Sequence, residues 1–304
     1  MANEFVGSCI VRRGGKRWVA PKIIPHFAKA ELYLEPFFGG GSVYYALPTG
    51  LYERYAVNDL DKSIYTFFSV LRDRTEELIA ACELSPFSKD EFAACLEKSE
   101  DPLEEARRVW VRTRQGFNGT ATHVGNWGRG DGTNWPPKRA EGKLRQLREY
   151  AAALRTTAFD NCDAIEFIPH WDRGHSFIYC DPPYVPETRR SDMYEHEMTA
   201  EQHRRLADEL RKAVAKGSRV AISGYASELY DRELYADWRR VEYDVAFSGQ
   251  MKKTGEERRT EVLWMSYPET EEIGATWKPA PKATSAREKA LLGALQRSGK
   301  VGRR

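Results

Sequence analysis

The chain has 304 residues, of which 41% are hydrophobic, 12% aromatic and 30% charged. This length fits two compact units or one larger domain with a sizeable insertion, and the composition excludes a disordered chain, a collagen-like repeat and a small disulfide-stapled protein. Lys and Arg total 47 against 45 for Asp and Glu, so with a net charge of +2 any polyanionic partner must be held by local patches.

The first predicted elements are a strand, a tight loop and a helix. The apolar run ELYLEPFF (31–38) stops at three glycines (39–41), and SVYYAL after them is typical of a helix start. A second apolar run, YAVN (55–58), leads into a segment with apolar residues at helical spacing, namely Ile64, Phe67, Phe68 and Leu71. This part of the chain is therefore predicted to be β-α-β-α.

The middle of the chain differs in character. Residues 85–115 contain two helix starts, at Ser88 and at Asp101, each followed three residues later by Glu, with no strand pattern between them. Residues 116–137 hold six glycines and two tryptophans but almost no aliphatic side chains. Because such a stretch cannot build a core, it is predicted to be an exposed loop.

The pattern then returns to alternating strands and helices. SFIYC (176–180) is a continuous apolar run, typical of a central parallel strand buried on both faces. Thr199 and Gln202 form a capping box that predicts a helix over about 200–216. Strands are predicted at RVAIS (219–223) and TEVLWMSY (260–267). This alternation favours an α/β fold with a doubly wound, mostly parallel sheet.

These elements divide the chain into three parts. Residues 1–72 and 156–268 are expected to form the α/β domain, and residues 73–155 an inserted, largely helical lobe that includes the glycine-rich loop. Residues 269–304 are Pro-rich and then basic, and are expected to be an appendage.

We expect no membrane-spanning segment, no disulfide bonds and no metal site. No stretch approaches the roughly 18 apolar residues of a membrane span, and the start MANEFVGSC lacks the order of a secretory signal. We therefore expect a cytoplasmic protein. The six histidines and the five cysteines show no metal-binding spacing, so we expect reduced thiols and no metal site; the cysteines are Cys9, Cys82, Cys95, Cys162 and Cys180.

The glycine-rich motif EPFFGGGS (35–42) indicates a ligand site. A strand that ends in a glycine loop lets backbone approach a ligand closely and places the next helix under it. The motif lacks G-K-[ST] and G-x-G-x-x-G, which disfavours a P-loop or a dinucleotide site. Asp59, at the tip of the next strand, can accept hydrogen bonds from ribose hydroxyls. An adenosine-bearing cofactor fits this segment, and a simple tight turn fits it equally well.

The second motif, DPPY (181–184), follows the SFIYC strand. Pro182 and Pro183 lack backbone donors, so this loop presents acceptors. The Asp181 carboxylate and the Pro182 carbonyl can each accept one hydrogen from an exocyclic amine, and Tyr184 can stack on a flat ring. These residues favour a pocket for an amino-bearing planar base, although a strand-ending turn capped by an Asp explains them as well.

Five segments stand in an order and spacing that resemble the Dam-type DNA adenine methyltransferases. They are GGK (14–16), EPFFGGGS (35–42), VNDLD (57–61), NCDAIEFI (161–168) and YCDPPY (179–184). The likeness extends from about residue 12 to residue 267. In this family, the order of cofactor motif, recognition insert and DPPY is called the alpha arrangement. The recognition insert of that arrangement corresponds to the predicted lobe.

The resemblance implies a Rossmann-like methyltransferase fold that binds S-adenosylmethionine and needs no metal. Asp59 would bind the ribose hydroxyls and Asp163 the adenine edge of the cofactor. The family usually has an aromatic residue two positions before GGK, where this chain has Arg12. The residues that the resemblance assigns to the cofactor pocket are Lys16, Glu35, Phe37, Gly39, Gly41, Ser42, Asp59, Asp163 and Asp181.

The implied reaction methylates the N6 amino group of an adenine flipped out of double-stranded DNA. The lone pair of this amine is delocalised into the ring, so accepting both hydrogens at Asp181 and Pro182 would favour a pyramidal, more nucleophilic nitrogen. Pro183 and Tyr184 complete the implied catalytic motif. DNA contacts are expected from cations, amides and aromatics in the lobe, namely Arg112, Arg114, Asn118, Trp127, Arg129, Trp135, Lys138 and Arg139.

Other functions remain open on the sequence alone. The DPPY chemistry also permits methylation of the N4 amino group of cytosine. A DNA-binding protein with a relic methyltransferase fold is a further alternative, against which the intact Asp59 and DPPY argue. An RNA or protein amino methyltransferase would leave the insert rich in Gly, Trp and Arg without a purpose.

Overall fold

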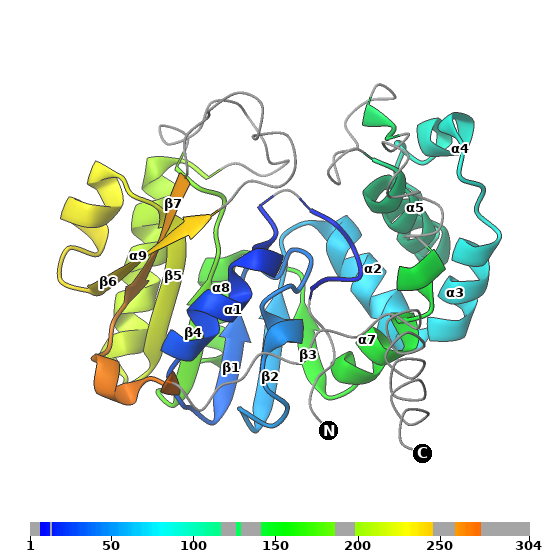
Figure 1. Ribbon diagram of the computed structural model, residues 1–304. Helices are drawn as coiled ribbons and strands as arrows, with labels where there is room; N and C mark the ends of the chain where they lie inside the picture. Colours follow the sequence, from blue (N-terminus) through cyan, green and yellow to red (C-terminus); the bar gives the residue numbers. More distant parts are fainter. Residues whose placement is uncertain are drawn as a thin grey trace, which may run out of the picture.

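One sheet of seven strands organises the protein, with strand order β3-β2-β1-β4-β5-β7-β6 (Figure 1). The computed structural model describes residues 7–12, 14–116, 126–128, 141–185, 198–245 and 259–274. The strands are β1 (Leu32–Glu35), β2 (Arg54–Asn58), β3 (Thr157–Asp160), β4 (Ser176–Cys180), β5 (Arg219–Tyr225), β6 (Arg239–Val245) and β7 (Arg259–Met265). Strands β1 to β5 are parallel, and β7 is antiparallel to β5 and β6.

The sheet is doubly wound, as the sequence predicted. From β1 the chain moves outward to β2 and β3, and then crosses to β4 and β5 on the other side of β1. The neighbours β1 and β4 pair in parallel, with Leu32 opposite Ser176. Their carboxyl ends therefore mark the point where the winding direction reverses, which is where open α/β sheets bind their ligands.

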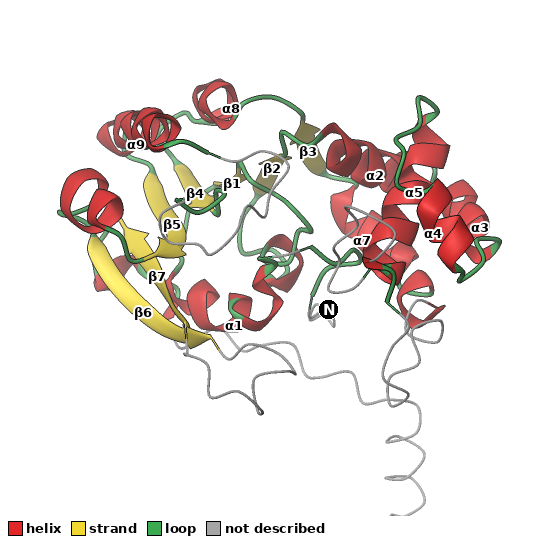
Figure 2. Ribbon diagram, turned by 90° about the horizontal axis from the view of Figure 1, so that it is seen from above, coloured by secondary structure: helices red, strands yellow, loops and turns green. Residues whose placement is uncertain are grey.

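Helices cover both faces and one edge of the sheet. The α-helices are α1 (Ala20–Ile23), α2 (Lys62–Asp73), α3 (Thr75–Glu83), α4 (Lys89–Ala94), α5 (Pro102–Gln115), α7 (Leu147–Leu154), α8 (Ala164–Trp171) and α9 (Ala200–Ala215). The short turns are η1 (Lys16–Trp18), η2 (Ile24–His26), η3 (Tyr44–Ala46), η7 (Leu229–Leu234) and η8 (Glu269–Glu271). Seen from above, α8 and α9 lie on one face of the sheet and α1 on the other (Figure 2).

The side chains of each strand point alternately to the two faces of the sheet, so the apolar core has a part on each face. Leu34 and Ile178 pack with residues of α8 and α9. Their neighbours Tyr33, Phe177 and Tyr179 point to the opposite face and pack with α1. Because neighbouring residues of a strand point to opposite sides, a continuous apolar run buries both faces of the sheet.

The helices between α2 and β3, namely α3, α4, α5 and α7, form a lobe beside the β3 edge (Figure 1). Helix α2 packs against both α5 and α7, and α3 packs against α5. The lobe residues Leu78, Trp110 and Leu147 belong to the same apolar cluster as Tyr33 and Phe177 of the sheet. The described part of the lobe therefore shares one core with the face of the sheet that α1 covers.

Most sequence predictions of helices and strands are confirmed. The side chains of Ser88 and Asp101 cap α4 and α5, and the Thr199 capping box begins α9. The helix expected after the glycines is wrong, because only the single turn η3 forms before Pro48. Strand β6 was not predicted. The helix expected from Lys62 onward is interrupted at Arg74, where α2 ends and α3 begins.

Two further findings concern the whole described region. No helix in it is long and apolar enough to cross a membrane. The five cysteines all lie within it and are free thiols. Burial raises the pKa of Cys9 to about 12, because a thiolate would lose its hydration there.

Asn58, the last residue of β2, connects the loops that follow three neighbouring strands. Its Nδ2 donates to the carbonyl of Pro36 after β1 and to that of Cys162 after β3, both at 3.0 Å. Its Oδ1 accepts from the Cys162 amide, also at 3.0 Å. The side chain is 1% exposed, so water cannot replace these three bonds.

We expect Asn58→Ala to lower the free energy of unfolding by about 3 kcal/mol, because each buried polar group left without a partner costs about 1 to 3 kcal/mol. Urea unfolding measures the change. Asn161→Ala is the matched control, since Asn161 also donates to two carbonyls, those of Asp59 and Leu60, from a more exposed position. Equal losses for the two variants would contradict a special role for Asn58.

Candidate active site

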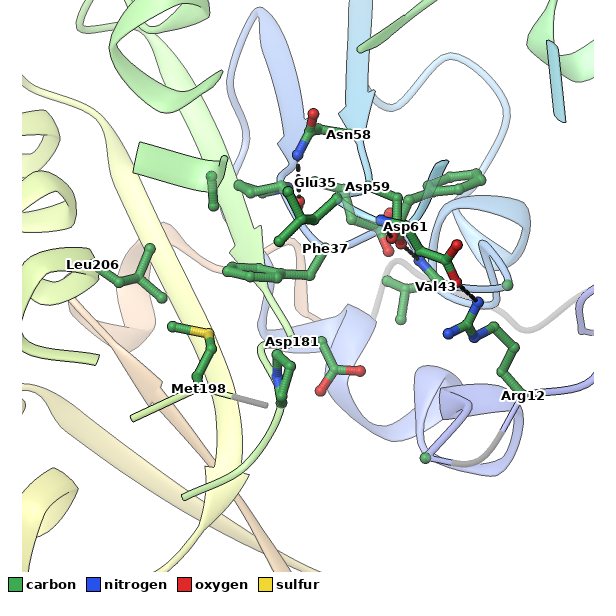
Figure 3. A pocket seen from close by; sticks show the side chains of 18 of the residues that line it. Arg12, Glu35, Phe37, Val43, Asn58, Asp59, Asp61, Asp181, Met198 and Leu206 are labelled. Carbon is green, nitrogen blue, oxygen red and sulfur yellow. Dashed lines mark hydrogen bonds and ion pairs between the residues drawn. The ribbon is translucent and has the colours of Figure 1, made fainter. Parts of the chain in front are cut away.

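A cavity of about 410 Å³ opens at the carboxyl ends of β1, β2 and β4. Met198 and Leu206 lie on one side of it, and the charged Asp59, Asp61 and Arg12 lie on the other, beside Val43 (Figure 3). Its lining includes eight of the nine residues predicted for the cofactor, namely Lys16, Glu35, Phe37, Gly39, Ser42, Asp59, Asp163 and Asp181. Residues far apart in the sequence are thus brought to one site.

The glycine loop has two different roles. Gly39 has φ +53°, and its amide donates to Asp59 Oδ2 at 2.6 Å. Gly41, the ninth predicted residue, does not line the cavity. Its φ is +69°, and a Cβ atom there would lie 2.6 Å from the Phe38 ring and 2.8 Å from the Tyr45 ring. Packing against aromatic rings therefore accounts for Gly41.

Two acids follow β2 at the rim of the cavity. Asp59 accepts from the Gly39 amide through Oδ2 and from the Asp61 amide through Oδ1 at 2.9 Å. Burial raises the pKa of Asp59, and the nearby Arg12 opposes this rise. Asp61 caps α2 by accepting from the Ser63 amide. Its carboxylate also pairs with the Arg12 guanidinium at 2.8 Å.

Asp163 stands at the third strand end, after β3. Its Oδ1 accepts from the Ile165 amide at 3.1 Å and so caps α8. The residue is exposed on the wall of the cavity. A carboxylate has more acceptor sites than this one bond uses, so Asp163 can also receive a hydrogen bond from a bound ligand.

The DPPY motif surrounds the ammonium of Lys16. Lys16 Nζ lies 2.8 Å from Asp181 Oδ1 and donates to the Tyr184 hydroxyl at 2.6 Å. It also lies 4.8 Å from the centre of the Tyr184 ring. Glu261 of β7 is a third partner, at 3.9 Å. Lys16 is 3% exposed, so this is a buried cluster of opposite charges.

Burial and the charge of Lys16 have opposite effects on the pKa values of Asp181 and Glu261. Burial raises the pKa of Asp181, and the Lys16 ammonium opposes the rise. Burial also raises the pKa of Glu261, again against the effect of Lys16. Glu35, at the end of β1, is 2% exposed, and its pKa is raised well above its usual range by burial. The hydroxyl of Tyr33 donates to Glu35 at 2.8 Å.

The apolar side of the cavity was missing from the sequence analysis, except for Phe37. Figure 3 shows Met198 and Leu206 facing the same space as the Phe37 ring, and Ile165 is a further apolar side chain of the lining. Leu206 is a buried residue of α9, and an apolar residue at helical spacing gives no sign of a ligand. Ile165 lies inside the NCDAIEFI motif, and its position there was the available signal.

The predicted DNA contacts are only partly within the described residues. Arg112 lies inside the lobe, where it donates to Glu105 Oε1 at 2.6 Å and to the Cys95 carbonyl at 3.0 Å. This structural role was not anticipated. Arg114 lies 5.0 Å from the centre of the Trp110 ring. Outside the described residues lie Asn118, Arg129, Trp135, Lys138 and Arg139.

Trp127, the third described member of the predicted set, is held against the lobe. Its Nε1 donates to Gln115 Oε1 at 3.3 Å, and its backbone forms a bridge with Gly116. Its ring lies 6.0 Å from that of Phe87. Beside it a second cavity, of about 520 Å³, is lined by Phe87, Trp110, Arg114 and Gln115, among others.

Comparison with known proteins identifies the class to which this sheet and the DPPY motif belong. The model of the D12 class N6 adenine-specific DNA methyltransferases matches residues 13–247. The chain belongs to this family. It is therefore an enzyme that methylates the N6 amino group of adenine in DNA, which decides between adenine and the alternative of cytosine.

Individual relatives agree with this assignment. The chain is 29% identical over 234 residues to the DNA adenine methylase of Escherichia coli (strain K12), covering 73% of this chain and 81% of that one. It is 26% identical over 274 residues to the Type II methyltransferase M1.LlaDCHI of Lactococcus lactis subsp. cremoris, covering 84% and 93%. The DNA adenine methylase of Haemophilus influenzae is 27% identical over 263 residues, covering 79% and 87%.

Proposed function

We propose that the cavity binds S-adenosylmethionine and that the adenine methylated by this enzyme is flipped out of duplex DNA against the DPPY loop. The observation that carries the proposal is the position of Asp59 and Asp181 on one cavity, at the ends of β2 and β4. The cavity volume of about 410 Å³ lies within the usual range for small-molecule sites. Its apolar and acidic sides suit an adenine ring and the hydroxyls of a ribose.

The lining residues divide the work of binding. The Asp59 carboxylate, which the amides of Gly39 and Asp61 hold in place, would accept from the ribose hydroxyls. Phe37 and Leu206 would contact the faces of the adenine ring, and Asp163 would accept from its amino edge. The cofactor supplies an electrophilic methyl group on a sulfonium.

Asp181 would prepare the DNA amine for methylation. Its carboxylate can accept one amine hydrogen and the Pro182 carbonyl the other, which leaves the nitrogen lone pair directed at the methyl group. Fixed acceptors in a buried site are effective because they need no reorientation during the reaction. A stack on an aromatic ring is worth about 1 to 3 kcal/mol, so stacking on Tyr184 would repay part of the cost of flipping the base.

Lys16 lies between the two DPPY side chains that are proposed to bind the target base. Its ammonium contacts both Asp181 and the Tyr184 ring, which are the two groups proposed to receive the target base. We infer that Lys16 keeps Asp181 ionised before DNA binds.

Asp181→Ala tests the proposed role of the motif. We expect methyl transfer to be abolished, because one acceptor for the amine is lost, while S-adenosylmethionine and duplex DNA still bind. Methyl transfer is measured with tritiated cofactor, and binding by calorimetry in EDTA. Asp160→Ala is the matched control, since Asp160 also ends a strand, but its carboxylate bonds to Trp171 outside the cavity. An Asp181→Ala variant that is folded and active would refute the assignment.

Lys16→Met should shift the acidic limb of the pH profile of kcat/KM to higher pH. Burial already raises the pKa of Asp181, and removing the ammonium that opposes this rise leaves the carboxyl protonated over a wider range. Activity lost near neutrality should therefore return in part as the pH is raised. Lys62→Met, which removes an exposed ammonium at the start of α2, should leave the profile in place. A Lys16→Met profile that is lower but not displaced would contradict this role.

We propose that the lobe reads the DNA sequence. Arg114 lies over Trp110 on the wall of the second cavity, and a guanidinium is a group that can read base edges. Asn118, next to this region in the sequence, is proposed to act with it on the bases. Lys138 and Arg139 are proposed to contact phosphates together with Arg129, and Trp127 and Trp135 to contact bases or sugars.

Arg114→Gln should relax discrimination at one position of the recognition site, at a cost of about 1 to 3 kcal/mol for the matched duplex. Lys138→Gln should instead weaken binding to all DNA sequences alike. It should also reduce the slope of the logarithm of the binding constant against the logarithm of the salt concentration by about one. Binding is measured against matched and single-mismatch duplexes at several salt concentrations. Arg148→Gln, in an exposed pair with Glu76, is the control. Unchanged discrimination in Arg114→Gln would assign base reading elsewhere.

A further inference from the structure

Arg12 stands where the family usually has an aromatic residue, and it forms an ion pair, which an aromatic side chain cannot form. Its Nη1 lies 2.8 Å from Asp61 Oδ2, and the guanidinium lines the cavity (Figure 3). The two side chains are unequally exposed, at 30% for Arg12 and 7% for Asp61. The pair is therefore partly shielded from water, which makes it stronger than a surface pair.

The contact continues through Asp61 to Asp59. The Asp61 carboxylate accepts from Arg12 through Oδ2 and from the Ser63 amide through Oδ1. The Asp61 amide donates to Asp59 Oδ1, while Gly39 holds Asp59 Oδ2. Arg12 thus fixes the residue whose backbone orients one oxygen of Asp59.

The electrostatics agree with this geometry. Burial raises the pKa of Asp59, and among the effects that oppose this rise Arg12 is the largest. Burial would raise the pKa of Asp61 too, but Arg12 reverses the direction and lowers it. One guanidinium therefore stabilises the charged form of both acids at the rim.

We infer that Arg12 is a positioning residue of the cofactor site, which acts through Asp61 to hold the Asp59 carboxylate in the orientation that binds a ribose. This inference rests on the proposed role of Asp59. It assigns to Arg12 a selective effect on the sugar, whereas a role limited to attaching the N-terminal segment to α2 would affect every part of a ligand alike.

A pair of ligands that differ by one hydroxyl separates these two roles. The full chain is titrated by calorimetry with S-adenosylhomocysteine and with its 2′-deoxyribose analogue. We expect the wild-type chain to prefer the ribose form about tenfold, the ratio that corresponds to one hydrogen bond to a charged group. Arg12→Gln should weaken binding of the ribose form by a similar factor while leaving the deoxy form nearly unchanged.

Two further variants keep the test informative. Arg12→Lys retains a charge but offers no planar fork, so it should restore part of the preference. Arg17→Gln is the matched control, because Arg17 belongs to the same segment but is exposed, packs on Trp18 and does not line the cavity. It should bind both ligands as the wild type does. Thermal unfolding verifies that each variant is folded.

Different outcomes overturn different claims. If the wild type prefers the ribose form and Arg12→Gln keeps the same preference, the role of Arg12 is wrong while that of Asp59 stands. The same conclusion follows if Arg12→Gln weakens both ligands equally. If the wild type binds both forms equally, the ribose assignment of Asp59 fails, and the inference about Arg12 fails with it.

Discussion

The buried ammonium of Lys16 is the interaction on which the site depends. Asp181 follows β4 and Glu261 lies on β7, so Lys16 holds together two strands that are not neighbours in the sheet. An isolated charge costs several kcal/mol to bury, and so does each acid without its cation. The N-terminal segment that carries Lys16 must therefore fold across the strand ends before the acids there can stay ionised.

The same segment connects the two halves of the cavity. Arg12 pairs with Asp61 at the start of α2, and Lys16, four residues later, reaches the loop after β4. Further back, Ser8 and Ile10 lie against the glycine loop, where a Cβ on Gly40 would come within 2.7 Å of the Ser8 hydroxyl. A short stretch before the first strand thus contacts the loops after β1, β2 and β4, and it closes the side of the cavity that the sheet leaves open.

The sequence predicted the sheet well because apolar runs and capping residues act locally. SFIYC had to be a central strand, and Thr199 with Gln202 had to begin a helix. The helix after the glycines was wrong because Pro48 follows too soon, which no pattern of apolar residues reveals. The motifs also identified most of the charged residues that line the cavity. The roles of those residues remain predictions.

What the sequence did not reveal were relations between distant residues. Nothing adjacent to Asn58 indicates that it joins the loops after β1 and β3. The pairing of Arg12 with Asp61 spans 49 residues, and the sequence does not indicate that Arg112 pairs with Glu105. In each case the partner is fixed by how strands and helices are placed side by side, and a single polar residue type carries no information on that placement.

The way the lobe is attached has a consequence for the length of the segment between α2 and α7. The chain leaves the sheet region through α2 and returns through α7, and these two helices pack against each other. The entry and exit of the intervening segment are therefore neighbours, beside the paired strands β2 and β3. Loops whose ends are close tolerate changes in length at small entropic cost. If this segment reads DNA as proposed, its length can therefore change without moving its two points of attachment to the sheet region.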